Sequence, residues 1–151
     1  RSLSPSINDP FTAMSCIDRL GSALATLSER RIPSGYQYDD DGNLRLITRR
    51  VTFADLLDDA FNLIRQNSRG DVAVSIRLLE ALAVVAEQIN SQNNASHVWR
   101  HAKMVYRAAM ESIPEPNDRE DVEIRFRIVR QILGIDEEEL EAVIANSHPQ
   151  L

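Results

Sequence analysis

The chain has 151 residues, of which 43% are hydrophobic and 26% are charged, and its formal net charge is −6. A chain of this length can bury a core of its own, so we expect a single domain over residues 1–151 that needs no disulfide or metal to fold. The acidic balance argues against a nucleic-acid-binding protein, because that affinity rests on cations that neutralise phosphates. No stretch approaches the ~20 apolar residues of a membrane span.

The first predicted helix begins at Pro10. Asp9 suits the N-cap position, because its carboxylate can accept hydrogen bonds from the first free amides, and Pro10 suits the first helical position. We expect this helix to end near Arg31, ahead of Pro33. Its apolar residues recur at the spacing of one helix face: Met14, Ile17, Leu20, Gly21, Leu24 and Leu27.

Residues 36–38 and 44–47 carry the clear β signal of the chain. A Gly-containing loop between two β-prone runs predicts a hairpin. Two strands alone are only marginally stable, so we expect this hairpin to lean on helices. Its acidic loop does not fit a calcium site of the EF-hand type, which needs Gly at the sixth position and Glu at the twelfth; here Gly42 is fourth and Arg50 is twelfth.

The second and third predicted helices follow the hairpin. Thr52 and Asp55 have the spacing of a capping box and predict the start of the second helix. Gly70 interrupts the chain, and a third helix is predicted at about 72–92. That helix is apolar around most of its circumference, which is typical of a central helix that others touch on several sides.

The fourth and fifth helices complete the larger part of the predicted fold. Ser96 is predicted to cap the fourth helix, which ends before Pro114. Asn117 or Asp118 begins the fifth, and Gly134 is placed to act as its C-terminal cap.

A short sixth helix is predicted to start at Asp136, with Glu139 as its capping partner. The fold class is therefore mainly α: about six helices in a bundle around the central helix at about 72–92, with one small β-hairpin near 36–47.

The beginning of the chain carries a recognisable motif. Residues 1–13 read Arg-Ser-Leu-Ser-Pro-Ser-Ile-Asn-Asp-Pro-Phe-Thr-Ala, and residues 16–20 read Cys-Ile-Asp-Arg-Leu. They resemble the Ser-Pro-Gly-Ile-Asn-Asp-Pro-x-Thr-Ala signature of an uncharacterised family of predicted bacterial membrane proteins. Residues 70–82 also look like a segment of that family.

In that family, N-terminal transmembrane helices come first and a soluble region follows. The resemblance implies that this chain is a soluble fragment of a larger, membrane-anchored protein, and its first residue, which is not Met, fits an excised piece. It further implies that the membrane-embedded part of the same chain is a partner. The side of the membrane is left open, with the cytoplasmic side favoured.

The segment ahead of the first helix is a candidate ligand-binding loop. Ser4, Asn8 and Asp9 lie at the positive end of a helix, where free amides can hold an anion or a partner segment. The alternative is that Asn8 and Asp9 simply cap the helix, which alone explains these residue types.

His97 and His101 are candidate metal ligands. They stand four residues apart on a predicted helix, the spacing at which two imidazoles can share one ion. Glu80 or Glu87 of the central helix could supply a third ligand. Because both histidines flank the apolar face of their helix, the alternative is a pair of boundary histidines without a metal.

Arg125 falls inside the apolar arc of the fifth helix, so it is a candidate ligand-binding residue. A buried arginine needs a carboxylate or a ligand, because an unpaired buried charge is very unfavourable. The alternative is that it lies at an edge of the bundle and reaches solvent. The candidate carboxylate partners are Asp9, Asp18, Glu80 and Glu87.

No catalytic motif stands out, so no catalytic residue and no cofactor are predicted, and enzymatic activity is left open but not favoured. We expect an uncharacterised, non-enzymatic module for assembly, regulation or partner binding. The alternative is a sensor domain that binds a small ligand or a metal. A homo-oligomer is a possible assembly, because apolar surface on the outer helices could pair with a second copy. Nucleic acid is not expected as a partner.

Overall fold

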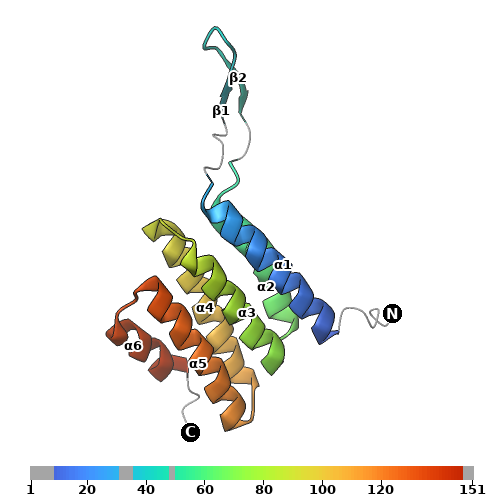
Figure 1. Ribbon diagram of the computed structural model, residues 1–151, viewed down its shortest axis with the longest axis vertical. Coiled ribbons are helices and arrows are strands. Elements are labelled where there is room, and N and C mark those ends of the chain that lie inside the picture. The colour runs from blue at the N-terminus through green and yellow to red at the C-terminus, as the bar shows by residue number, and fades with distance from the viewer. Residues whose placement is uncertain (1–8, 31–35, 48–49, 148–151) are drawn as a thin grey trace.

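The computed structural model describes residues 9–30, 36–47 and 50–147. In this part the chain forms six helices and a two-stranded antiparallel sheet, which confirms the predicted mainly α fold (Figure 1). The elements are α1 (Pro10–Ser28), β1 (Tyr36–Tyr38), β2 (Leu44–Ile47), α2 (Phe53–Asn67), α3 (Val72–Glu87), α4 (Gln92–Ser112), α5 (Pro116–Leu133) and α6 (Glu137–Ser147).

Helix α3 is the centre of the bundle, as its apolar circumference predicts. It packs against α1, α4 and α5, with a smaller contact to α2 (Figure 1). Eight of its residues are buried, and they cover a broad side of the helix rather than one narrow stripe. The helix ends at Glu87 and not near residue 92, because Gln88 already acts as the C-cap and Ser91 begins the next helix.

Three predicted helix ends are confirmed by their hydrogen bonds. Asp9 caps α1 by accepting from the amide of Phe11 at 3.0 Å. Thr52 and Asp55 form a reciprocal capping box at the start of α2. At the end of α5, Gly134 adopts a φ of 68°, the left-handed conformation that favours glycine at this position.

Two predicted helix starts are wrong. Helix α4 begins one turn earlier than expected, with Ser91 as its N-cap, while Ser96 lies inside the helix and donates to the carbonyl of Asn93 at 2.7 Å. Helix α5 begins at Pro116 rather than at Asn117 or Asp118, because the fixed φ of proline already suits the first helical turn. Helix α1 also ends at Ser28, about a turn before the predicted end.

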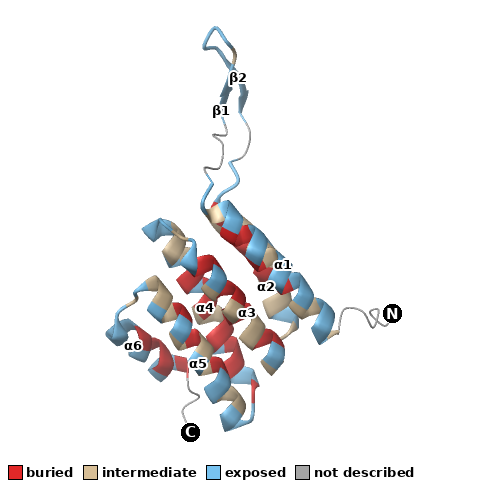
Figure 2. Cartoon of the chain, viewed as in Figure 1, coloured by how far each residue is buried: buried red, intermediate tan, exposed pale blue. Residues whose placement is uncertain are grey.

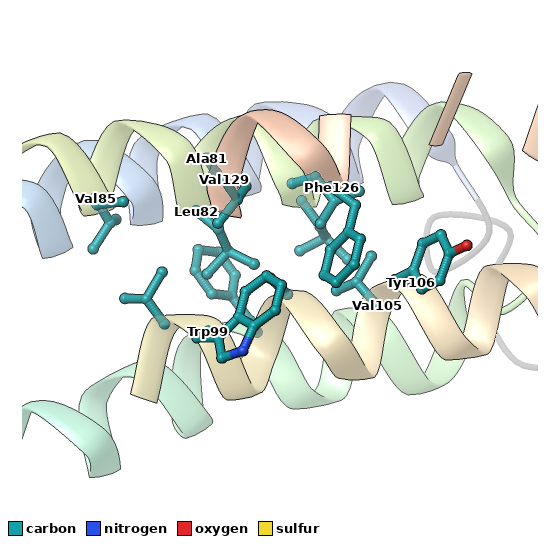
Figure 3. Packing of buried hydrophobic residues seen from close by; sticks show 14 of the residues in the cluster. Ala81, Leu82, Val85, Trp99, Val105, Tyr106, Phe126 and Val129 are labelled. Carbon is teal, nitrogen blue, oxygen red and sulfur yellow. The ribbon is translucent and has the colours of Figure 1, made fainter. Parts of the chain in front are cut away.

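A stack of three aromatic rings joins α4 to α5 in the core (Figure 3). The ring of Phe126 lies between Trp99 and Tyr106, with ring centroids 4.8 Å and 4.4 Å away and interplanar angles of 10° in both cases. All three side chains are buried. Apart from Phe53 and Phe61 of α2, the other buried hydrophobic residues of the core are not aromatic, and Figure 2 shows that the buried residues lie where the helices face one another.

Within the described part of the chain, no helix combines the length and the apolar character that crossing a membrane requires.

Candidate functional site

The hairpin stands apart from the helices. It extends beyond the end of α1, away from the bundle (Figure 1), and every residue of both strands is exposed (Figure 2). The predicted hairpin is confirmed, but the expectation that it leans on helices is wrong. The apolar stripes of α1 and α2 are already covered by α3, by α4 and by each other, which leaves the hairpin no open helix face to pack on.

One side of the hairpin is apolar. The strands pair in the register Tyr36↔Ile47 and Tyr38↔Leu44, and cross-strand partners share a side. Leu44 and Ile47 lie on one side although they are three residues apart, because a β-bulge interrupts the register between the two pairs. The apolar face of the hairpin therefore consists of Tyr36, Tyr38, Leu44 and Ile47, with exposed fractions of 56%, 63%, 45% and 67%.

The opposite side of the hairpin carries a second pair, Gln37 and Leu46. Leu46 is 47% exposed, close to the 45% of Leu44 on the apolar face. The two leucines are thus alike in residue type, strand and exposure and differ in the side on which they lie.

The tip of the hairpin is acidic and its base is basic. Asp39 accepts from the amide of Asn43 at 2.8 Å and from Arg45 at 2.6 Å, and these hydrogen bonds, the one from Asn43 foremost, lower the pKa of its carboxyl. Asp40 and Asp41 beside it are exposed and form no ion pair with other described residues. Two more exposed arginines, Arg30 and Arg50, lie on either side of the hairpin in the sequence, Arg30 after the end of α1 and Arg50 ahead of α2.

A histidine–aspartate pair joins α2 to α4, with His101 buried and the Asp58 side chain 37% exposed. The Nε2 atom of His101 lies 2.7 Å from Oδ1 of Asp58, and Arg100 donates to the same oxygen at 2.6 Å. Desolvation is the largest single influence on the pKa of Asp58 and acts to raise it. The interactions with His101 and Arg100, their hydrogen bonds foremost, together outweigh desolvation, so the pKa is lowered. The carboxylate therefore stays ionised and holds the imidazole in one orientation.

His101 is fully buried, which corrects the expectation that it flanks the apolar face. Helix α4 contacts α2 as well as α3, α5 and α6, so its buried arc is wider than one stripe. Desolvation lowers the pKa of His101 more than the contact with Asp58 raises it. Its Nδ1 atom is buried and has no hydrogen-bond partner among the described residues, so a second proton on the ring would lack an acceptor.

The predicted metal site remains a prediction. His97 lies one helical turn before His101 and is half-buried. Within the described residues, no group of three or more His, Cys, Asp and Glu side chains is placed to hold a metal ion. Glu80, one of the expected third ligands, instead faces Arg77 and Arg125.

Most of the predicted ligand-binding loop, including Ser4 and Asn8, lies outside the described residues. Asp9 is described, and both of its carboxylate oxygens are engaged: one accepts from the amide of Phe11 and the other from the hydroxyl of Thr12 at 2.7 Å. The hydrogen bond from Thr12 foremost, and then that from Phe11, lowers the pKa of Asp9.

Arg125 is half-buried at the edge between α5 and α3. Its Nε atom lies 3.6 Å from Glu80, which is one of its four expected partners. Arg77 contacts Glu80 at 3.3 Å and Asp18 of α1 at 3.5 Å, so these four charged side chains link three helices. Asp9, Arg125 and His101 thus each contact different partners, and their contacts do not converge on a common pocket.

A groove of about 540 Å³ lies between the end of α3, the start of α4 and the α5–α6 turn. Glu139 accepts from the indole of Trp99 at 2.5 Å and lies 3.6 Å from Lys103. Because these charged groups neutralise each other, the groove offers no unpaired charge that would select a ligand.

The sequence reasoning did not identify Asp58 or the apolar face of the hairpin. Asp58 lies one position after the buried Leu57 and borders the apolar stripe of α2. On the hairpin, the alternation of Tyr36 and Tyr38 was a readable signal. The bulge that brings Leu44 and Ile47 onto the same side leaves no mark in the sequence.

Comparison with known proteins adds a family match and distant relatives. The family model described as "Predicted membrane protein (DUF2254)" matches residues 1–84. Uncharacterised proteins of Mycobacterium bovis and of two strains of Mycobacterium tuberculosis are each 29% identical to the chain over 119 residues. The aligned part covers 79% of this chain and 23% of each relative, so the chain spans about a quarter of their length. No solved structure matches.

Proposed function

This chain belongs to the DUF2254 family of predicted membrane proteins, and on that premise we propose that it is a non-enzymatic module that binds a protein partner through its hairpin. The hairpin lies within the region that the family model matches. The module would serve assembly of the larger protein rather than chemistry. The membrane-embedded part of the same chain and a second copy of this chain are the two partners that we consider.

One observation carries this proposal: the apolar face of the hairpin is exposed and far from the helices (Figures 1 and 2). Isolated two-stranded hairpins are marginal in water, and a contiguous apolar surface bounded by polar groups is typical of a binding site. A partner that covers this face would stabilise the hairpin and remove the apolar side chains from water.

The charges around the apolar face favour a protein partner over a lipid surface. Asp39, Asp40 and Asp41 occupy the tip, where a hairpin would enter a membrane, and anionic headgroups repel carboxylates. A protein surface can instead present cations to these residues. The hairpin therefore fits a protein–protein contact better than membrane insertion.

Site-specific photo-cross-linking in the full-length protein tests the proposal. A photoreactive amino acid in place of Leu44 should give a discrete protein adduct, because this position faces the bound partner. The same amino acid in place of Leu46 is the matched control, because that leucine has almost the same exposure on the opposite side of the hairpin. Equal labelling from both positions, or none from Leu44, contradicts a docking role for the apolar face.

The second candidate function is a metal-binding sensor, and the His101–Asp58 contact supports it. Histidines that bind metals commonly donate their other ring N–H to a carboxylate, which is the arrangement of Nε2 here. Purified protein should then contain stoichiometric zinc that is lost in both the His97→Gln and the His101→Gln variants. A protein without bound metal after incubation with zinc would exclude this function.

A further inference from the structure

We propose that the apolar face of the hairpin binds the same face of a second copy of this chain, with the two hairpins antiparallel. This inference rests on the proposed docking function and names the partner. Because both copies use the same surface, the contact would be two-fold symmetric. Each contact between one residue of the first copy and another residue of the second would then occur twice.

Shape supports pairing face to face. Both strands are short and carry four of their five large apolar side chains on one side, with Leu46 on the other. Two copies can therefore lie about 10 Å apart with the four side chains of each copy interleaved, as in packed sheets. Pairing edge to edge would instead leave both apolar faces in water. The face-to-face arrangement is the one that buries Tyr36, Tyr38, Leu44 and Ile47 of both copies.

Charge decides the relative direction of the two hairpins. A parallel arrangement would bring the tips together and place Asp39, Asp40 and Asp41 of one copy beside the same residues of the other. An antiparallel arrangement places the tip of each hairpin beside the base of the other, where Arg30 and Arg50 are exposed. Opposite charges then meet at both ends of the contact, and like charges stay apart.

The contact is small, so the association should be weak and depend on concentration. Four apolar side chains from each copy form its centre, whereas a stable interface has about 20–30 residues on each side. Anchoring of both copies in one membrane would raise their effective concentration and favour the pair without any further contact.

Charge reversal tests the antiparallel arrangement. Sedimentation equilibrium of this chain should show a monomer–dimer equilibrium that either Asp41→Arg or Arg50→Asp weakens by about tenfold, since the symmetric contact contains each ion pair twice. An equimolar mixture of the two variants should bring opposite charges together at both ends of the contact and associate more tightly than either variant alone. Failure of the mixture to recover overturns the antiparallel arrangement.

Leucine substitutions separate loss of the contact from loss of the hairpin. Leu44→Ser should abolish dimers at concentrations where the parent chain forms them, while Leu46→Ser should leave the dimer constant within about twofold. The two substitutions remove the same side chain at nearly equal exposure, 45% and 47%, from opposite sides. Equal effects of both variants overturn the assignment of the apolar face as the interface.

Cross-linking then identifies which residues meet. In a Cys16→Ser background, which removes the native exposed thiol, Asp41→Cys and Arg50→Cys chains are mixed and treated with a short bis-maleimide. Mixed dimers should exceed both homodimers. A predominance of Asp41→Cys homodimers would indicate tips together and overturn the inference.

The inference and the underlying docking function can fail separately. A chain that stays monomeric, while the photoreactive group at Leu44 labels another protein or the membrane-embedded part of its own chain, overturns the second copy as partner and leaves the docking function standing. A monomeric chain without any adduct from Leu44 overturns both.

Discussion

Gly21 of α1 lies directly against Ala81 of α3. A Cβ atom at Gly21 would stand 2.9 Å from the Cβ of Ala81, closer than real Cβ atoms approach. Both residues are buried, and Ala81 belongs to the central helix. The absence of a side chain at residue 21 therefore sets how closely α1 approaches α3, and it gives Gly21 a packing role inside a helix where glycine is otherwise unfavourable.

Gly21→Ala should lower the free energy of unfolding by about 1 kcal/mol. Overpacking destabilises by about 1–3 kcal/mol, and the higher helix propensity of alanine offsets about 1 kcal/mol of that. Urea denaturation measures the change. Ser22→Ala, at the adjacent exposed position of α1, is the control and should not destabilise. In the Gly21→Ala/Ala81→Gly double variant, a coupling energy near zero would show that the two positions do not limit the packing.

The His101–Asp58 pair should make the fold sensitive to acid. The pKa of His101 is lowered by desolvation below its ordinary value of about 6.5, so the unfolded chain binds a proton more readily than the folded one. Stability is then complete above about pH 6.5 and decreases as the pH falls below that value. The lowered pKa of Asp58 acts in the same direction at more acidic pH, near and below its ordinary value of about 3.9.

The His101→Gln variant should remove the part of this pH dependence that lies just below pH 6.5. Glutamine can still donate to Asp58 but does not titrate. Melting temperatures between pH 7 and pH 5 test the difference, and His97→Gln, one turn earlier on α4, should behave like the parent chain. An identical pH profile for the parent and for His101→Gln would show that His101 is not the responsible group.

Two serines near the start of α4 should differ in their effect on stability. Ser91→Ala should lower the free energy of unfolding by about 0.5–1 kcal/mol, because Ser91 is the N-cap and accepts from the amide of Asn94. Ser96→Ala should be neutral or slightly stabilising, because Ser96 lies within the helix, where alanine has the higher propensity. Thermal denaturation distinguishes the two variants, and a larger loss for Ser96→Ala would contradict this helix start.

The sequence predicts elements well where one local interaction dominates. Asp9, Thr52 and Gly134 terminate helices through hydrogen bonds or a backbone conformation confined to a few residues, and all three agree with the structure. Ser91 and Ser96 are both plausible caps by residue type. Which of the two serines caps α4 depends on where α3 ends and how α4 packs. A short stretch of sequence does not carry that information.

The candidate sites depend on contacts between segments far apart in the chain, so the sequence predicts them less well. His101 is buried because α2 covers a second side of α4, and Asp58 becomes its partner through the same packing. The sequence predicts only that His101 flanks the apolar face of its helix. The strands of the hairpin are predicted correctly, but the prediction that the hairpin packs on helices is wrong. Its position away from the bundle follows from helices that already cover each other.

Removal of the hairpin should leave the helical bundle intact. Replacement of residues 36–47 by a short Gly-Ser linker should change the free energy of unfolding by less than about 1 kcal/mol, because loop length enters closure entropy only logarithmically and the strand residues are exposed. Leu57→Ala, a fully buried change in α2, shows the sensitivity of the assay with an expected loss of about 2–5 kcal/mol. The variant without the hairpin should fold yet lose self-association. A large loss of stability would instead assign the hairpin to the folding core.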